Sequence, residues 1–255
     1  MDPTGRFSDR AENYVRYRPG YPVEILDLLQ ERCGLTQDTV VADVGSGTGL
    51  LSQLFLGNGN WVFGVEPNAE MRHAGEGFLA GYEHFTIVAA TVEATTLSSN
   101  SVGFIAAGQS FHWFDPIPTR AEFVRVLKPG GWVVLVWNTR KATPSSLSAA
   151  YEKLIELHGT DYDQVNHGRR GGSDSIRQFF DPEDYETVTL ENRQVFDFEG
   201  MKGRLLSSSY APNEGDAGYP EMVRDLGRIF SEYERNGKVD SDYDTKVHYG
   251  RLEPA

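Results

Sequence analysis

VADVGSGTGL, residues 41–50, is the segment from which most of the predicted fold follows. Its first four residues are apolar and mostly β-branched except for Asp43, which is typical of a strand buried in a sheet. Glycines stand at positions 45, 47 and 49, and the apolar residues of 50–55 then recur with helical spacing. We therefore predict a strand that leads through a glycine turn into a helix.

Similar strand-like runs, bounded by Gly, Pro or Asn, occur along the chain. The predicted strands are residues 39–44, 61–65, 85–89, 102–107 and 131–137. Between these strands, apolar residues recur with helical spacing over 50–55 and 117–127, and the second of these predicted helices ends at residues 128–130. A further short helix is predicted between Pro22 and Gly34. This alternation predicts an α/β fold, a doubly wound and mostly parallel sheet with helices on both faces and ligands at the carboxyl ends of its strands.

The last third of the chain has a different pattern. A helix predicted over residues 147–158 leads into the polar, glycine-broken stretch 167–172, which is predicted to be mobile. The sequence then predicts a strand over 187–198, a helix over 222–233 and a strand over 242–252. We expect these two strands to close one edge of the sheet and, because no linker is evident, the chain to form one domain.

Composition and charge exclude several classes of protein. The chain has 255 residues, and its 39% hydrophobic and 24% charged content is that of an ordinary globular protein. The net charge of −13 disfavours nucleic-acid binding. The longest apolar run, 132–137, is far below the ~20 residues of a membrane helix. The single cysteine, Cys33, predicts neither a disulfide nor a metal site, and with the polar N-terminus it favours a cytoplasmic location. A small-molecule partner is expected.

The glycine turn narrows the choice of ligand. No Gly-Lys-Ser/Thr follows it, which disfavours nucleoside triphosphates, and a dinucleotide motif would need glycine where the chain has Leu50. Asp43, at the predicted strand tip, would repel a pyrophosphate but suits an ammonium group. Glu66, 21 residues after Gly45, is placed to accept hydrogen bonds from ribose hydroxyls. S-adenosylmethionine carries both an ammonium group and a ribose, and it has no phosphate.

The motifs around this turn resemble a known enzyme family. DVGSGTG (43–49) followed by GVEPN (64–68) resembles the first two motifs of the class I S-adenosylmethionine-dependent methyltransferases. Further motifs are similar to the type 11 branch, near the trans-aconitate-methyltransferase-like proteins; they are FSDRAENYVRYRPGYP (7–22), GQSFHWFD (108–115), RVLKPGGWVVLVWNTR (125–140) and, more weakly, SSSY (207–210) with the final strand. The resemblance implies a Rossmann-like sheet of seven strands with an antiparallel final strand and a helical insertion on the acceptor side.

The resemblance also implies how one domain, 1–255, is divided. Its expected parts are an N-terminal lid and helix (1–34), a cofactor-binding core (35–140), acceptor-side additions (141–184 and 199–240) and final strands (185–198 and 241–252). The branch usually has Gly-x-Ala-Glu where this chain has ATVE (90–93), but the Val92 N–H needs no particular side chain to reach adenine. The expected cofactor-binding residues are Asp43, Gly45, Ser46, Gly47, Gly49, Glu66, Pro67, Thr91, Val92, Glu93, Gln109, Tyr14 and Arg18.

The segment after the fourth strand is expected to carry catalytic residues. Trp113 follows that strand at the switch point of the sheet, where an aromatic face can stabilise a sulfonium charge. His112 is predicted to bind the acceptor or to act as a base. Packing of either side chain in the core remains the alternative.

Residues from the lead and from the fifth strand are expected to reach the acceptor. Tyr14, Tyr17 and Arg18 are predicted to close a lid, or else to lock the N-terminal segment onto the domain. Arg18 and Arg140 can each pair with the carboxylate of the cofactor or of an acidic substrate. The predicted acceptor-binding residues are Tyr17, Asn138 and Arg140, whereas Arg169 and Arg170 are interpreted as a solvated loop. No metal site is predicted.

The predicted function is methyl transfer from S-adenosylmethionine to a small molecule by in-line displacement, with S-adenosylhomocysteine as product. Oxygen or a carboxylate is the expected acceptor, and carbon and nitrogen stay open. Nucleic acid bases are disfavoured because Gly-Gln-Ser-Phe (108–111) replaces the Asn/Asp-Pro-Pro-Tyr/Phe of their methyltransferases. The alternatives are a non-catalytic S-adenosylmethionine-binding protein and an NAD-dependent oxidoreductase, the second opposed by Leu50 and Asp43. The acceptor and the oligomeric state are not predicted.

Overall fold

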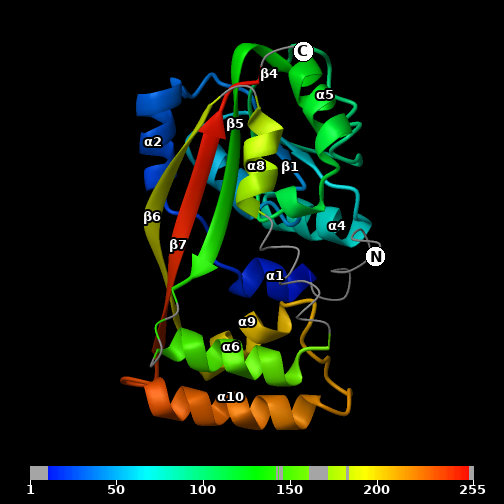
Figure 1. Cartoon of the computed structure of the whole chain (residues 1–255). Coiled ribbons are helices and arrows are strands. Elements are labelled where there is room, and N and C mark those ends of the chain that lie inside the picture. The colour runs from blue at the N-terminus through cyan, green and yellow to red at the C-terminus, as the bar shows by residue number, and fades with distance from the viewer. Residues whose placement is uncertain (1–10, 142, 144–145, 161–171, 182–183, 253–255) are drawn as a thin grey trace.

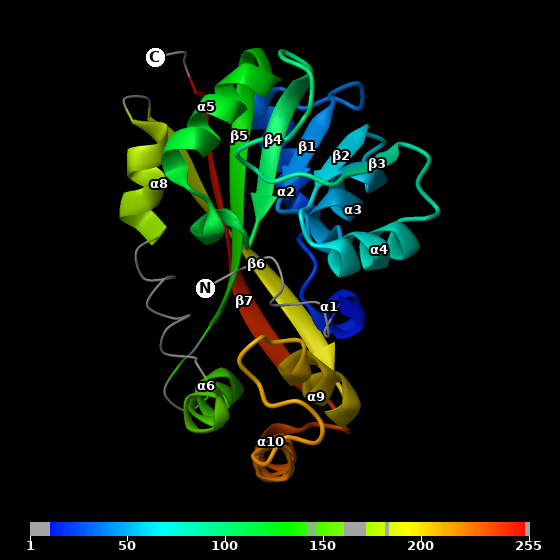
Figure 2. The same ribbon diagram turned by 90° about the vertical axis from the view of Figure 1, so that its right-hand side faces the viewer.

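The computed structural model describes residues 11–141, 143, 146–160, 172–181 and 184–252. Its centre is a seven-stranded sheet in the order β3-β2-β1-β4-β5-β7-β6 (Figures 1 and 2). The strands are β1 (Val41–Val44), β2 (Val62–Val65), β3 (Phe85–Val88), β4 (Val102–Gly108), β5 (Leu127–Arg140), β6 (Tyr185–Phe196) and β7 (Val239–Gly250). Strands β1 to β5 pair in parallel and β7 is antiparallel to both of its neighbours, so the predicted fold class is confirmed.

Helices cover both faces of this sheet because alternate residues of the central strands point to opposite sides. In β5, Val134 and Val136 pack in the apolar cluster that includes α2 (Glu24–Cys33) and α3 (Leu50–Gly57). Val133 and Leu135 pack in the opposite cluster, with α5 (Pro116–Val126) and α8 (Gly172–Phe180). All four of these strand side chains are fully buried, which is the pattern expected of a sheet covered on both faces. The other α-helices of the described residues are α1 (Ala11–Tyr17), α4 (Ala69–Phe78), α6 (Leu147–His158), α9 (Phe198–Leu206) and α10 (Tyr219–Tyr233).

Strands β5, β6 and β7 are much longer than β1 to β3, and their extensions support a separate group of helices. Figures 1 and 2 show α6, α9 and α10 gathered at the end where β5 finishes, with α1 lying between them and the rest of the domain. The helices share a third apolar cluster, in which Leu154, Leu205 and Leu226 from α6, α9 and α10 are buried. This helical layer therefore lies beyond the carboxyl ends of the parallel strands, where ligands bind in sheets of this type.

Most predicted elements are found, with differences at their ends. The helix predicted over 147–158 has these bounds, and the final strands are found at 185–196 and 239–250. Residues 128–130, predicted to separate a helix from a strand, instead lie within β5, because the register of β4 and β5 shifts between Val102 and Phe104 and admits the extra residues. The stretch predicted to be mobile, 167–172, and with it Arg169 and Arg170, lies outside the described residues except for its last position.

No helix in the described ranges has the length and apolar character that crossing a membrane requires.

Candidate functional site

A cleft opens at the carboxyl ends of β1, β2 and β4, where the glycine turn, the loop after β3 and helix α1 meet. The sheet order places β1 between β2 and β4, so segments from three separate parts of the chain converge there. The described residues that line the cleft are Tyr14, Gly45, Gly47, Glu66, Pro67, Asn68, Met71, Thr91, Val92, Glu93, Gly108, Gln109, Ser110, Trp113 and Phe114.

The glycine turn lies directly against the end of β4, which explains why a side chain is not tolerated there. Gly45 has a φ of +62°, and a Cβ atom at that position would lie 2.8 Å from the Cβ of Ser110. The Ser110 hydroxyl donates a hydrogen bond to the Val44 carbonyl at 3.1 Å and so holds the two strand ends together. Gly47, with a φ of +56°, has open space beside it and lines the cleft.

Glu66 connects this turn to the end of β2. One carboxylate oxygen accepts a hydrogen bond from the Gly47 N–H and the other from the Asn68 N–H, both at 2.9 Å. The side chain is buried, which raises the pKa of Glu66, while these two hydrogen bonds act in the opposite direction. Because each carboxylate oxygen has a second lone pair, Glu66 can also accept hydrogen bonds from a diol in the cleft.

Asp43 lies beneath the turn and is completely buried, and it does not line the cleft. One carboxylate oxygen accepts a hydrogen bond from the Ser52 hydroxyl of α3 at 2.6 Å, and the other, Oδ1, has no partner among the described residues. Burial raises the pKa of Asp43 to about 7, although the hydrogen bonds from Ser52 favour its charged form. An unsatisfied carboxylate oxygen in an apolar setting favours a cation, so the donor set suits an ammonium group rather than a phosphate.

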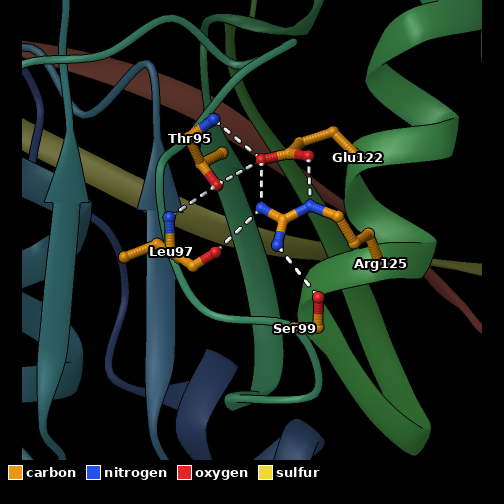
Figure 3. Close-up of polar contacts among 5 residues, drawn as sticks. All are labelled: Thr95, Leu97, Ser99, Glu122 and Arg125. Atoms are coloured by element: carbon orange, nitrogen blue, oxygen red, sulfur yellow. Dashed lines mark hydrogen bonds and ion pairs between the residues drawn. The ribbon is translucent and has the colours of Figure 1, made fainter.

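The loop after β3 supplies Thr91, Val92 and Glu93 to the cleft, and a bridge between Thr91 and Ala94 shapes it into a tight turn. Figure 3 shows that the continuation of this loop is fixed to α5 by hydrogen bonds to Glu122 and Arg125, which form an ion pair with each other within that helix. Glu122 accepts hydrogen bonds from the N–H and the hydroxyl of Thr95 at 2.8 and 2.6 Å, and Arg125 donates to it at 2.7 Å.

Replacing Glu122 with glutamine is expected to lower the free energy of unfolding by about 1–3 kcal/mol, the range for hydrogen bonds to a charged group. Hydrogen bonds from Arg125 hold the pKa of Glu122 at about 2. A carboxylate whose pKa is lowered by folding stabilises the folded state above its unfolded pKa, and loses that effect as the pH falls toward 2.

Urea unfolding of the wild type and of Glu122→Gln at pH 7 and pH 3 tests this prediction. Glu232→Gln, at an exposed position of α10, is the control. A stability of Glu122→Gln equal to that of the wild type at pH 7 would contradict the role of this ion pair.

The segment after β4 turns sharply into the cleft. Gln109 has a φ of +58°, and its side-chain amide pairs with the backbone of Asn138 on β5, at 2.9 and 3.2 Å. Its side chain therefore faces β5 while the residue lines the cleft. In the 3₁₀ helix Phe111–Trp113 that follows, Trp113 lines the cleft and His112 does not, the two rings lying 4.8 Å apart.

The N-terminal helix reaches the cleft through one residue. Tyr14 lines it, and the guanidinium of Arg18 lies over the Tyr14 ring at 4.7 Å. Arg18 also donates to the carbonyl of Ser207, beyond α9, at 2.9 Å. The ring of Tyr17 lies so close to Gly203 of α9 that a Cβ there would not fit. Helix α1 thus bridges the cleft and the helical layer.

Asn138 and Arg140, predicted to bind the acceptor, lie on β5 outside the cleft lining. The Asn138 amide donates to the carbonyl of Gly20 at 3.1 Å and accepts from Thr245 and Asn192. Arg140 lines a separate cavity among the added helices.

The structure brings ten of the predicted site residues together in one cleft, namely Tyr14, Gly45, Gly47, Glu66, Pro67, Thr91, Val92, Glu93, Gln109 and Trp113. Outside its lining lie Asp43, Ser46, Gly49, His112, Tyr17, Arg18, Asn138 and Arg140. Sequence reasoning missed Asn68, Met71, Gly108 and Phe114 as lining residues, whereas Ser110 lies in the segment 109–113 that was expected to line the acceptor pocket. Asn68 caps α4 by accepting from the Met71 N–H at 2.8 Å, and its place in the GVEPN motif was a usable signal.

Comparison with known proteins finds similarity to methyltransferases. Residues 42–135 match a family model described as a methyltransferase domain. An uncharacterised methyltransferase of Mycobacterium tuberculosis is 36% identical over 159 residues, which are 62% of this chain and 61% of that protein. One from Schizosaccharomyces pombe is 27% identical over 135 residues, 52% of this chain and 53% of that protein. The chain thus spans less than two thirds of the length of these relatives.

Solved structures share the fold over almost the whole chain. A candidate type II methyltransferase from Anaeromyxobacter dehalogenans has a TM-score of 0.68 at 22% identity, covering 94% of this chain and all of that one. A candidate methyltransferase from an antibiotic biosynthesis pathway of Anabaena variabilis has a TM-score of 0.58 at 16% identity. The match covers 93% of this chain and 99% of that one. At these identities the likeness shows the fold alone.

Proposed function

We propose that the chain transfers a methyl group from S-adenosylmethionine to an oxygen or a carboxylate of a small-molecule acceptor, which the match of residues 42–135 to a methyltransferase domain supports. The observation that most strongly supports this proposal is the pair of buried acidic side chains, Asp43 and Glu66, at the glycine turn. Glu66 faces the cleft with both oxygens held by backbone N–H groups, and one oxygen of Asp43, beneath the turn, has no partner in the part of the chain that the structure describes.

The residues present fit such a cofactor. Glu66 would accept hydrogen bonds from its ribose. Asp43 would attract its ammonium group together with the Ser46 hydroxyl, which has no partner among the residues that the structure describes. Val92, Met71 and Phe114 give the cleft an apolar side suited to adenine. Thr91, Glu93 and Gln109 line the same cleft, and so does Tyr14 of α1, on whose ring Arg18 stacks from outside the lining.

The chain needs few chemical groups for this reaction. When bound, S-adenosylmethionine supplies a methyl group that its sulfonium charge already activates. The residues of the chain then bind and orient the two partners and exclude water. An ionised carboxylate acceptor needs no base, whereas a hydroxyl acceptor would lose its proton to a neighbouring group, for which His112 is the candidate from the segment after β4.

Incubation with methyl-labelled S-adenosylmethionine and a panel of small acids, phenols and amines tests the proposal. Label in an acid or a phenol is the expected result. Label in none of them, together with tight S-adenosylhomocysteine binding, would favour a non-catalytic binding protein. Tight binding of NADH without binding of S-adenosylmethionine would favour an oxidoreductase instead.

Trp113→Ala is expected to lower kcat by about 2- to 30-fold, the range of a cation–π contact of about 0.5–2 kcal/mol, with little change in cofactor affinity. His112 does not line the cleft, so His112→Ala is expected to lower kcat less than Trp113→Ala does. A larger loss of kcat in His112→Ala would assign His112 the role of the base. Steady-state kinetics together with cofactor titration checks both. A loss of affinity without a loss of kcat would assign Trp113 to cofactor binding.

A further inference from the structure

Asn138, near the carboxyl end of β5, is hydrogen-bonded to two different segments that line the cleft. The first is the turn after β4. The Asn138 N–H donates to the side-chain oxygen of Gln109 at 2.9 Å, and the Asn138 carbonyl accepts from the Gln109 amide at 3.2 Å. Gln109 has a φ of +58°, which is uncommon for a residue other than glycine. The backbone of Asn138 therefore helps to hold this turn in an unfavourable conformation.

The side chain of Asn138 is bonded to the N-terminal segment. Its Nδ2 donates to the Gly20 carbonyl at 3.1 Å, and the same carbonyl accepts from Nδ2 of Asn192 on β6 at 2.9 Å. The Asn138 Oδ1 accepts from the Thr245 hydroxyl on β7 at 2.5 Å and from Asn192 at 3.1 Å. Asn138 is 9% exposed and Thr245 is fully buried. Neighbours on β6 and β7 thus fix the orientation of one buried amide, and two amides converge on one backbone carbonyl.

Gly20 lies between two tyrosines that reach the cleft from the N-terminal segment. Tyr14, on α1, is a lining residue. Tyr21 packs against Gly108 at the end of β4, where a Cβ atom would lie 2.9 Å from the Tyr21 Cζ atom. Gly108 lines the cleft and directly precedes Gln109. The contacts therefore form a closed circuit that joins β5, the turn after β4 and the N-terminal segment.

The residues before Gly20 have contacts of their own. The Tyr17 carbonyl accepts from Gln194 of β6 at 3.3 Å, and Arg18 donates to the carbonyl of Ser207 at 2.9 Å. These contacts join the segment to β6 and to the helical layer, whereas the contact at Gly20 joins it to β5, which also holds the turn after β4. Loss of the Asn138 contact is therefore expected to loosen the segment without detaching it from the domain.

We propose that Asn138 is a positioning residue for the methyl transfer: its side chain holds residues 14–21 against the cleft, beside the Gln109 turn that its backbone holds. The inference rests on the proposed function, because these two segments would enclose the cofactor. Asn138 itself lies outside the cleft lining, so its effect on binding passes through Tyr14 and through the contact of Tyr21 with the end of β4.

Calorimetric titration with S-adenosylhomocysteine tests this in a double-mutant cycle of Asn138→Ala and Tyr14→Ala. Asn138→Ala keeps the backbone pairing with Gln109 and removes one donor to Gly20, so affinity is expected to fall about fivefold or more. In the Tyr14→Ala background the same change is expected to have a smaller effect, because the positioned side chain is already absent. A residue needed only for stability would change affinity equally in both backgrounds.

Two control variants are expected to match the wild type. Thr139→Ala changes the next residue of β5, which is exposed. Gly20→Ala keeps the carbonyl that accepts the two hydrogen bonds, and its added Cβ atom would meet no described atom within 4 Å.

Hydrogen exchange of the chain without ligand gives a second measurement. Asn138→Ala is expected to speed exchange of the amides of residues 14–21 severalfold and to leave those of α10 unchanged. Unchanged exchange over 14–21, wild-type affinity in Asn138→Ala, or an equal loss of affinity in both backgrounds would overturn the inference. If Asn138→Ala does not fold, Asn192→Ala, which removes the other donor to Gly20, takes its place with the same outcomes. A wild-type chain that does not bind S-adenosylhomocysteine would refute the proposed function, while the exchange measurement still decides whether Asn138 holds the segment.

Discussion

Replacing Glu66 with alanine is expected to weaken S-adenosylhomocysteine binding by about 5- to 150-fold, the equivalent of about 1–3 kcal/mol for hydrogen bonds to a charged group. The carboxylate has two tasks in the structure. It faces the cleft, and it accepts from the N–H groups of Gly47 and Asn68, which fixes the glycine turn relative to the start of α4. Alanine removes the ribose acceptor and leaves two backbone donors without their partner.

Calorimetric titration measures this loss, and two variants control it. Glu66→Gln keeps the size of the side chain and one acceptor oxygen, so its affinity for S-adenosylhomocysteine is expected to lie between those of the alanine variant and the wild type. Glu76→Gln changes the same charge at an exposed position of α4 and is expected to leave affinity unchanged. Wild-type affinity in a folded Glu66→Ala variant would remove Glu66 from the binding site.

Binding of S-adenosylhomocysteine is expected to strengthen about tenfold between pH 6 and pH 8, with release of a proton from Asp43. Burial raises the pKa of Asp43 to about 7 in the chain without ligand. Only the ionised carboxylate attracts an ammonium group, so below pH 7 the proton must leave as the ligand binds. Because the ligand favours the ionised form, affinity rises with pH and becomes constant above the pKa of the free chain.

Titration in buffers of different ionisation enthalpy measures the released proton directly. Asp43→Asn keeps the shape and the contact to Ser52 but cannot ionise, so it is expected to bind weakly and with no pH dependence over this range. The same pH dependence in Asp43→Asn and the wild type would show that another group releases the proton.

The strands of the sheet could be predicted because each is a short apolar run between turn-forming residues. The glycine turn, Glu66 and the Thr91–Glu93 loop could likewise be placed at one edge, since parallel strands bring their carboxyl ends together. Helices α4 and α9 could not be predicted, because each contains two glycines and buries few apolar residues. Their position depends on contacts with segments distant in sequence.

The orientation of individual side chains could not be predicted for a similar reason. Gln109 faces β5 because its amide pairs with the backbone of Asn138, which becomes its neighbour only in the folded sheet. Asp43 is drawn beneath the turn by Ser52 on the following helix. Arg204 belongs to no motif, and its burial beside Arg140 arises only when α9 packs against the extended β5 and β7.

A crystal structure of the chain grown with S-adenosylhomocysteine tests the central claim most directly. The account predicts density for the ligand in the cleft over the glycine turn, with its ribose hydroxyls within hydrogen-bond distance of Glu66 and its ammonium group on the side of Asp43. Density for the ligand elsewhere on the molecule, or a Glu66 side chain turned away from the ribose, would contradict it.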